Sequence, residues 1–581
     1  GNMSKKQTVA EVLWEMLVAA GVKRCYGIVG DAMNPIMDAL RGFPEIEFIH
    51  VRNEEAGTFA ANAESFVTGG PVAVCGTSGP GATHLVNGLF DALHERVPTI
   101  AIAGDVDSTV IGSGVVEEVD TNVAYLSCTL SRARIENPWQ AGPAFRSAID
   151  RAITERGPVL LSIPGDVAAM EYQGAPVRVT PQQSGEPVLV PSQTELQALA
   201  DAINSAEKVT IFGGDGCRGA GELVVELAKK INAPVGYSWR GKAALEGDNP
   251  NDVGMSGLLG WGACYKAMHE ADALLMLGTD WPFTTFYPSD VETYQVDTVP
   301  GHLGRHAPNL TQGFVGDVGD TIAALLPLIE AKTDRKFLDT CLKKTEKDVK
   351  RLNHYVERGP KMSPIRPEYL AATLNELADD DAAFTVDTGT AYIWSARYIK
   401  IGPKRSLFAS ASWASMANAM PNAMGIQLAQ PDRQVIALCG DGGISMLLGE
   451  LITIAERQLP VKLFVLHNNK LDFVNIEFQE AGLRPFGTDL WNPDFSRVAD
   501  AIGLKGVRLD DPGTVRETVQ EALDHDGPVL VDAMVDPNAL AMPPHVNKQM
   551  VSRFGFSEMK QIMHGEGGNV VKNVEKNIDL I

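Results

Sequence analysis

The stretch that decides the fold is Val435 to Val474, VIALCGDGGISMLLGELITIAERQLPVKLFVLHNNKLDFV. It predicts a buried strand over Val435–Cys439, followed by a sharp turn over Gly440–Gly443. A helix to about Arg457 and a second strand over Val461–Leu466 complete one βαβ unit. The handedness of such a unit places the carboxyl ends of both strands at the same edge of a parallel sheet. Ligands of these sheets bind outside that edge.

Two polar side chains follow the two strands. Asp441 comes directly after the first strand and Asn468 after the second, so a carboxylate and an amide oxygen converge beside glycine N–H groups and a helix N-terminus. Hard oxygen ligands suit Mg²⁺, and N–H groups at a helix end suit a diphosphate. The alternative is that Asp441 only caps the helix and the glycines only turn the chain.

Size and composition limit the class of protein. At 581 residues the chain is too long for one ordinary core, so about three domains are expected. A net charge of −23 argues against nucleic acid and against tight binding to an anionic membrane face. The seven cysteines are scattered without a CxxC pair, which favours a reducing cytoplasm over a disulfide scaffold or zinc site. There is no run of about 18 apolar residues that could span a bilayer.

Alternating strand and helix patterns predict doubly wound parallel sheets, which are α/β domains. The segment Val72–Asp105 has the same order of strand, glycine loop, helix and strand as Val435–Val474, which predicts two copies of one fold. A Pro-, Gln- and Ser-rich stretch over Pro176–Pro191 indicates a linker. The predicted divisions are a first domain over 1–180, a second over 192–333, a charged helical connector over 334–363, a third domain over 364–540 and a tail over 541–581.

The second domain contains a weak dinucleotide-binding motif. Gly214-x-Gly216-x-x-Gly219 follows a predicted strand over Val209–Phe212. No acidic residue closes the next strand, over Val235–Trp239, so an NAD site is not favoured.

The Asp441-Gly442-Gly443 turn with Asn468 resembles the GDG…N signature of thiamine diphosphate enzymes. In that family the Asp and Asn side chains bind Mg²⁺ together with the main-chain carbonyl two residues after the Asn, which here is Lys470. Most members have Asn-Asn at the end of the second strand. This chain has His467-Asn468-Asn469, and only Asn468 keeps the usual distance from Asp441.

Glu54 lies just past a predicted strand over Ile46–Val51, at the start of a helix. Taken alone, it is a capping carboxylate at a helix N-terminus. The resemblance implies instead that Glu54 hydrogen-bonds to the aminopyrimidine of thiamine diphosphate, a cofactor that serves as nucleophile and electron sink. Because the family takes this Glu from one subunit and the metal motif from another, the resemblance also implies a homo-oligomer, a dimer or a dimer of dimers.

Further cofactor contacts are implied by the resemblance at two more helix starts, over Asp387–Thr390 and Ala414–Met416, where Met416 would bend the cofactor. Taken alone, both segments are plain turns. The implied contacts are Gly389, Thr390, Ala414, Ser415, Met416, Gly442, Gly443, Asn469, Leu471, Asp472, Phe473 and Val474.

The resemblance is closest to the flavin-containing pyruvate oxidases and quinone-linked pyruvate dehydrogenases, and it covers nearly the whole chain. In the second domain it depends on Ser238–Lys242, Gly254–Gly260, Gly278–Pro288 and Tyr294–Pro300. Without the resemblance these are glycine-rich loops at strand ends. The FAD contacts that it implies are Arg240, Ser256, Gly257, Leu258, Leu259, Thr279, Asp280, Trp281, Pro282, Phe283 and Asp297.

Four positions around the expected reaction centre depart from this branch. Asn53 replaces a His, Val116-Glu117 replaces Phe-Gln, and Asp472 replaces a Gly, whereas Phe473 and Glu477 match pocket-lining positions. The extra carboxylates would repel a 2-oxo acid unless apolar burial raises their pKa. We therefore hypothesise that Glu117 changes the substrate or its affinity. The candidate reaction-centre residues are Glu54, Glu117, Phe473 and Glu477.

The expected reaction is oxidative decarboxylation of pyruvate, or of a close 2-oxo acid, to acetate and CO₂, with electrons passing to FAD and then to a quinone or another acceptor. One alternative is carboligation like that of acetolactate synthase, with FAD in a non-redox role. Another is a catalytically silent cofactor-binding assembly protein.

Quinone-linked members end in a lipid-binding amphipathic helix, and here Val570, Val574, Ile578 and Ile581 recur at helical spacing. A docked C-terminus fits this spacing equally well. A cytoplasmic location follows, with or without a peripheral contact to the inner face of the cell membrane.

Overall fold

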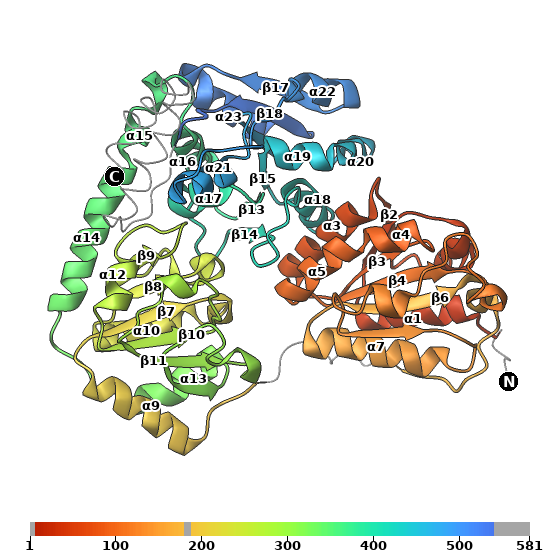
Figure 1. Ribbon diagram of the computed structural model, residues 1–581, viewed down its shortest axis with the longest axis horizontal. Coiled ribbons are helices and arrows are strands. Elements are labelled where there is room, and N and C mark those ends of the chain that lie inside the picture. The colour runs from red at the N-terminus through yellow and green to blue at the C-terminus, as the bar shows by residue number, and fades with distance from the viewer. Residues whose placement is uncertain (1–5, 179–187, 540–581) are drawn as a thin grey trace.

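The computed structural model of the chain describes residues 6–178 and 188–539. Over these residues, three parallel six-stranded sheets are each flanked by helices, as Figure 1 shows. The predicted fold class, three doubly wound α/β domains, is therefore confirmed. The predicted tail, with its predicted membrane contact, lies outside the described residues, as does the middle of the predicted linker.

The first domain has the sheet order β2-β1-β3-β4-β6-β5. Its central strands β3 (Val72–Gly76) and β4 (Thr99–Asp105) are buried along their whole length, as expected for a parallel sheet covered by helices on both faces. α1 (Val9–Ala20) begins at a capping box made by Thr8 and Glu11. The remaining elements are β1 (Arg24–Gly27), α2 (Asn34–Leu40), β2 (Glu47–His50), α3 (Glu54–Thr68), α4 (Pro80–His84), α5 (Val86–Glu95), α6 (Thr121–Ala124), β5 (Ser131–Arg134), α7 (Ala141–Glu155), β6 (Val159–Pro164) and α8 (Gly165–Ala169).

The third domain repeats this topology. Its order, β14-β13-β15-β16-β18-β17, matches the first sheet strand for strand, so the predicted internal repeat is confirmed. Its elements are α16 (Pro367–Leu377), β13 (Ala383–Val386), α17 (Ala391–Tyr398), β14 (Ser406–Ala409), α18 (Ala419–Ala429), β15 (Val435–Gly440), α19 (Asp441–Met446), α20 (Leu451–Arg457), β16 (Lys462–His467), α21 (Asp472–Glu480), α22 (Phe495–Ile502), β17 (Lys505–Leu509), α23 (Val515–Asp524) and β18 (Val529–Met534).

The second domain has a different order, β12-β11-β10-β7-β8-β9, which is typical of dinucleotide-binding sheets. The direction of the chain across the sheet reverses between β7 (Val209–Gly213) and β10 (Ala273–Leu277). The other elements are α9 (Gln193–Ser205), α10 (Gly221–Ile231), β8 (Val235–Tyr237), α11 (Lys242–Leu245), β9 (Asp252–Met255), α12 (Cys264–His269), β11 (Glu292–Asp297), β12 (Leu310–Val315) and α13 (Val318–Leu325). The connector is helical as predicted, in α14 (Lys336–Leu352) and α15 (His354–Glu357).

The first and third domains meet through α3 and α18. Asn422 of α18 donates from Nδ2 to the carbonyl of Phe59 on α3, at 2.8 Å. One turn further along, Gly425 allows α18 to approach the carbonyl of Ala60 so closely that a Cβ there would overlap it. All seven cysteines are buried and free. No helix among the described residues combines the length and the apolar character needed to cross a membrane.

The central βαβ unit differs from its prediction in two details. Gly440, and not Asp441, is the N-cap of α19, so the predicted turn is the first turn of a helix. The predicted single helix is interrupted after Met446 by a 3-10 turn over Leu448–Glu450. The interruption turns Glu450 toward the first domain, where its Oε1 accepts the N–H groups of Arg52 (2.6 Å) and Asn53 (2.7 Å).

Candidate active site

The βαβ unit brings the two predicted metal ligands together. Asp441 is buried at the carboxyl end of β15, and its Oδ2 accepts the backbone N–H groups of Asn468 (3.0 Å) and Asn469 (2.7 Å) at the end of β16. Its Oδ1 accepts the N–H of Gly442 at 2.8 Å. Burial raises the pKa of Asp441, and the N–H donors of Asn469 and Gly442 oppose that rise.

The loop after β16 presents oxygen atoms at the place where β15 and β16 end, between Asp441 and Asn468, which we call the metal corner. Asn469 has a φ of 60°, a left-handed conformation that turns the chain sharply behind Asn468. Leu471 N–H and Leu490 N–H pair this loop with a second segment by hydrogen bonds of 2.8 Å to the Thr488 and Asn469 carbonyls. Among the described residues, the carbonyl of Lys470 accepts no hydrogen bond, so it is available as a ligand. A carboxylate, an amide and a free carbonyl fit Mg²⁺.

The described residues contain no group of three or more His, Cys, Asp or Glu side chains that could hold a metal. A metal at this corner would therefore depend on the Asn468 amide and the Lys470 carbonyl as well as on Asp441.

Asp387 fixes the backbone beside the corner through hydrogen bonds. Its carboxylate, at the end of β13, accepts the N–H groups of Ala419 at 2.8 Å and Gly440 at 3.0 Å. Burial raises the pKa of Asp387 to about 7, and these two N–H bonds oppose the rise. A Cβ on Gly443 would overlap the Asp387 carboxylate and would lie 3.4 Å from the N–H nitrogen of Ala417. Only glycine fits at position 443, and this leaves backbone open to a diphosphate.

The predicted segment Ala414–Met416 lies on the loop that leads from β14 into α18. Two residues of this loop without glycine's freedom, Ala414 (φ 60°) and Ala417 (φ 70°), are left-handed. The structure holds the strained loop by hydrogen bonds, since Ser415 N–H donates to Ser410 Oγ (2.9 Å), which donates to the buried Asp91 (2.9 Å). A Cβ on Gly442 would lie 3.4 Å from Met416 Cε, so Met416 borders the corner.

Glu54 is the first residue of α3 and is only 5% exposed. Its Oε1 lies 3.2 Å from Nδ1 of His84. His84, which the sequence analysis missed, therefore supplies an imidazole beside Glu54, while Asn53 caps α3 by accepting the Glu55 N–H. Within the described residues, the Glu54 carboxylate makes no hydrogen bond or ion pair to the third domain.

The residues predicted to lie around the reaction centre have different environments. Asp472 is buried at the start of α21, and burial raises its pKa to about 7, with Lys470 opposing and Asp441 adding to the rise. Glu117 and Glu477 are exposed in the single chain. Asp472 is therefore buried as the hypothesis requires, whereas Glu117 is exposed and its Oε2 accepts the Ser78 hydroxyl at 2.7 Å. Phe473 is half-buried against the third-domain core.

The segments that are predicted to contact FAD lie together at the carboxyl ends of the strands in the second domain's sheet. Ser256, one residue after β9, is buried and its Oγ has no hydrogen-bond partner in the described part of the chain. The neighbouring Gly257 (φ 85°) lies under the ring of Trp281, whose Cζ2 would be 3.1 Å from a Cβ there. An unpaired buried hydroxyl beside an aromatic ring and a glycine fits a polar, aromatic ligand such as a flavin nucleotide.

The Gly214-x-Gly216 motif has a packing explanation. A Cβ on Gly214 would lie 2.5 Å from Thr279 Cβ, and one on Gly216 would lie 2.5 Å from Gly278 Cα. These glycines therefore let the loops after β7 and β10 approach each other. Asp297, at the end of β11, accepts the Val299 N–H at 2.8 Å.

Arg240 joins all three domains. Its Nη2 donates to Glu95 of α5 at 2.5 Å and to Ser412, on the loop before Met416, at 2.6 Å. The predicted contact of Arg240 with FAD phosphates stays a prediction.

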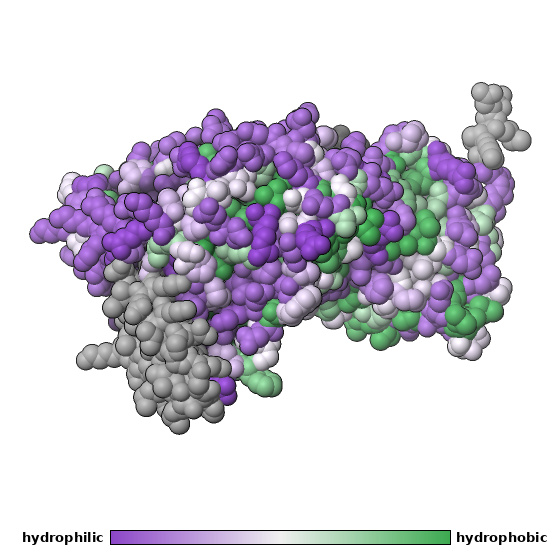
Figure 2. Space-filling model, turned by 90° about the horizontal axis from the view of Figure 1, so that it is seen from above, coloured by the Kyte–Doolittle hydropathy of each residue, from purple (hydrophilic) through white to green (hydrophobic). Residues whose placement is uncertain are grey.

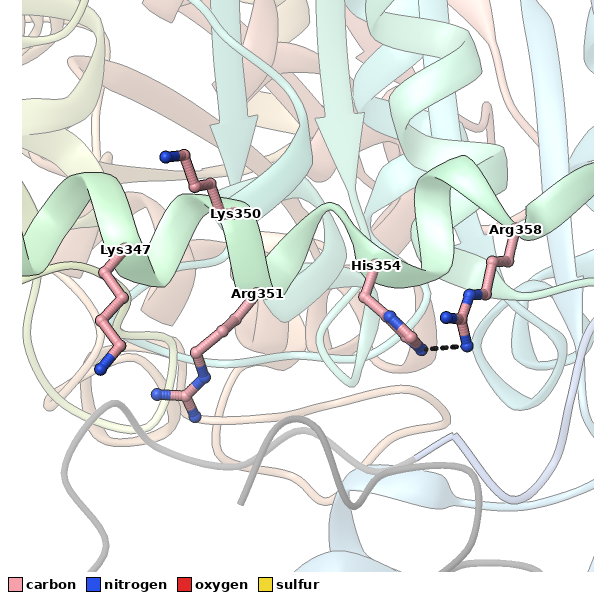
Figure 3. Close-up of a pocket in the computed structure, with 5 residues that line it drawn as sticks. All are labelled: Lys347, Lys350, Arg351, His354 and Arg358. Carbon is pink, nitrogen blue, oxygen red and sulfur yellow. Dashed lines mark hydrogen bonds between the residues drawn. The ribbon is translucent and has the colours of Figure 1, made fainter.

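A separate hollow of about 640 Å³ lies on the connector. Figure 3 shows the five residues that line it. It contains none of the predicted site residues. Its lining is basic: Lys347, Lys350, Arg351, His354 and Arg358, with Arg358 Nη1 3.1 Å from His354 Nε2.

Comparisons with known proteins agree with this geometry. Three family models, described as "Thiamine pyrophosphate enzyme" N-terminal TPP binding domain, central domain and C-terminal TPP binding domain, match residues 7–124, 196–325 and 387–533. The "Putative thiamine pyrophosphate-containing protein YdaP" of Bacillus subtilis is 33% identical over 536 residues, which cover 91% of this chain and 92% of that protein.

The chain belongs to the thiamine diphosphate enzyme family.

Two further relatives of this family have named activities. An "Acetolactate synthase large subunit" of Parasynechococcus marenigrum is 32% identical, with 93% of this chain and 90% of that protein covered. A "Pyruvate oxidase" of Lactiplantibacillus plantarum is 28% identical, with 90% of this chain and 87% of that protein covered. The chain is thus similar to thiamine diphosphate enzymes of both kinds.

Proposed function

We propose that the protein catalyses the oxidative decarboxylation of pyruvate, or of a close 2-oxo acid, to acetate and CO₂, and that FAD and then a quinone accept the two electrons. The observation that carries the proposal is the corner at the ends of β15 and β16, where Asp441, Asn468 and the Lys470 carbonyl stand beside the backbone of Gly443. Thiamine diphosphate bound there would supply a nucleophilic carbon and an electron sink.

Different groups of residues would bind the metal, the diphosphate and the rings of this cofactor. Asp441, Asn468 and the Lys470 carbonyl would hold Mg²⁺, and the loops over 387–390 and 414–416 would enclose the diphosphate and the rings. Because Glu54 makes its hydrogen bond within its own domain, a second copy of the chain would bring its Glu54 to this corner, with His84 beside the carboxylate.

The second domain supports the binding of FAD, which the proposed electron transfer requires. Its sheet order, the unpaired Ser256 hydroxyl and the Trp281 ring over Gly257 fit FAD. The choice of a quinone as final acceptor comes from the resemblance to the quinone-linked branch. The acceptor is tested by comparing a quinone, an artificial dye, and oxygen with phosphate.

Carboligation is the second candidate, because the acetolactate synthase relative is 32% identical and covers 93% of this chain, against 28% and 90% for the pyruvate oxidase relative. Anaerobic addition of pyruvate to the flavin-loaded protein separates the two. Bleaching of the flavin absorbance with acetate as product supports oxidation. Acetolactate or acetoin without bleaching contradicts it and supports carboligation, and absence of CO₂ release from every 2-oxo acid would indicate a silent cofactor-binding protein.

Glu117 offers a test of the substrate. Its exposed carboxylate, next to the proposed pocket, would repel a substrate carboxylate, so Glu117→Gln should raise kcat/KM for pyruvate about tenfold, or about 1.4 kcal/mol. Ser78 can donate its hydroxyl to the amide oxygen as it does to the carboxylate, so the loop should keep its shape. An unchanged kcat/KM would show that the charge of Glu117 does not select the substrate.

A further inference from the structure

We propose that Asn492 is a positioning residue for the metal ligand Asp441, held in register by a closed chain of hydrogen bonds that passes through Asn469, His467 and Asp532. The inference rests on the metal corner of the proposed function. It does not depend on which 2-oxo acid reacts or on which acceptor takes the electrons.

Asn492 reaches the corner from a segment far along the chain. Its Nδ2 donates to Asp441 Oδ2 at 2.9 Å, the same oxygen that accepts the Asn468 and Asn469 N–H groups. The segment that carries Asn492 is itself paired with the loop after β16, because Leu490 N–H donates to the Asn469 carbonyl and the Thr488 carbonyl accepts the Leu471 N–H. Asp441 is therefore held by two loops, and not only by the loop that follows β16.

The second hydrogen of the Asn492 amide enters a longer chain. Nδ2 also donates to Asn469 Oδ1 at 3.1 Å, and that oxygen lies 2.9 Å from His467 Nε2. His467 Nδ1 lies 2.8 Å from Oδ1 of the buried Asp532 on β18. The other oxygen of Asp532 accepts the N–H of Phe495, three residues after Asn492, at 2.9 Å. The chain thus returns to the segment where it began.

The donors and acceptors of this chain fix the orientation of the Asn492 amide. Asp441 Oδ2 is a carboxylate oxygen and can only accept, so the NH2 group of Asn492 must point at it, and Asn469 Oδ1 accepts the second hydrogen. Turning the amide over would place its oxygen against a carboxylate and a carbonyl oxygen, with no hydrogen between them. Asn492 is therefore a fixed, uncharged donor to a metal-binding carboxylate, the kind of neighbour that orients a ligand without competing for the metal.

A residue that only stabilised its loop would affect folding but not the affinity for metal. The two roles are separated by titrating Mg²⁺ into metal-free protein in a fixed excess of thiamine diphosphate, by calorimetry, and by measuring the Tm of the metal-free protein. Neither measurement uses a 2-oxo acid. Failure of this inference would therefore leave the proposed reaction standing, and failure of the proposed reaction would leave this inference standing.

The variants are Asn492→Leu, which keeps a similar volume but has no donor, and Asn492→Ser, which keeps one hydroxyl donor. Asp489→Ala is the matched control, because this exposed carboxylate lies on the same segment. We expect Asn492→Leu to weaken Mg²⁺ binding about 10- to 100-fold, Asn492→Ser to weaken it less, and Asp489→Ala to leave it unchanged, with the metal-free Tm of all three near that of the parent.

Mg²⁺ affinity at the parental level in Asn492→Leu would overturn the inference. So would a loss of affinity that is equal in Asn492→Leu and Asp489→Ala, or one that follows the loss of metal-free Tm from variant to variant. If Asn492→Leu does not fold, parental affinity in Asn492→Ser would overturn it, and weakened affinity in that variant at an unchanged Tm would support it.

Discussion

Gly443 is the residue at which the proposed site tolerates least change. A methyl group there would overlap the buried Asp387 carboxylate, which holds Ala419 and Gly440 in place. Gly443→Ala should therefore weaken thiamine diphosphate binding about tenfold or more and lower stability by about 1–3 kcal/mol. Gly449→Ala is the control, because nothing lies within 4 Å of a Cβ at that position. The affinities are measured by calorimetric titration with thiamine diphosphate. Equal affinities for the two variants would contradict the claim that only glycine fits at position 443.

Single residues of the site were only partly predictable. Asp441 and Asn468 follow from the sequence because each comes directly after a strand, and parallel strands end at one edge. His84 and Asn492 could not be predicted, because neither follows a strand and each meets its partner only through the tertiary fold. For Asn492 no local signal exists, since it lies 51 positions from Asp441.

At the scale of elements, the start of β9 contains a carboxylate that makes stability depend on pH. Burial raises the pKa of Asp252 to about 7, against the opposing N–H bond from Gly254. Between the ordinary Asp pKa and that value the folded protein binds more protons than the unfolded chain, so stability falls as pH rises through this range.

Asp252→Asn removes this titration. The amide oxygen can still accept the Gly254 N–H, and the amide NH2 can donate to the Tyr237 hydroxyl in place of the bond that this hydroxyl donates to the carboxylate. The Tm of the variant should therefore exceed that of the parent increasingly as pH rises from about 5 to about 8, with a difference in unfolding free energy of up to about 4 kcal/mol. Asp248→Asn, at a nearby exposed position, is the control. Parallel Tm curves for Asp252→Asn and the parent would contradict the prediction.

Elements themselves were largely predictable because their hydrophobic periods are strong, as in β15 and β16. The interruption between α19 and α20 was not, because its cause is not local. Glu450 leaves the helical pattern to accept N–H groups of Arg52 and Asn53, in a different domain. Tertiary contacts of this kind override a helical pattern that the sequence alone extends to Arg457.

At the scale of the whole molecule, the exposed apolar residues mark the surface that the proposed second copy would cover. Trp491 and Phe486 are 88% and 87% exposed on the segment that pairs with the loop after β16, and Val116, Val123 and Leu126 are exposed in the first domain. Figure 2 shows hydrophobic patches gathered over the first-domain half of one face. Large exposed rings beside the proposed site are typical of an interface.

Trp491→Asp should therefore shift the protein toward monomers and weaken thiamine diphosphate binding at low protein concentration, whereas Trp491→Phe should preserve both. Sedimentation velocity with and without the cofactor measures the effect. An Asp variant with the oligomeric state of the parent would show that this ring does not lie in the interface.

The most direct test of the central claim is binding of thiamine diphosphate with and without Mg²⁺, in the parent and in Asp441→Ala. The parent should bind the cofactor tightly only with the metal, removal of the metal by a chelator should release it, and Asp441→Ala should bind weakly in both conditions. Two results would contradict the claim that the corner between Asp441 and Asn468 anchors the cofactor. One is tight binding of thiamine diphosphate by Asp441→Ala, and the other is an affinity of the parent that is the same with and without Mg²⁺.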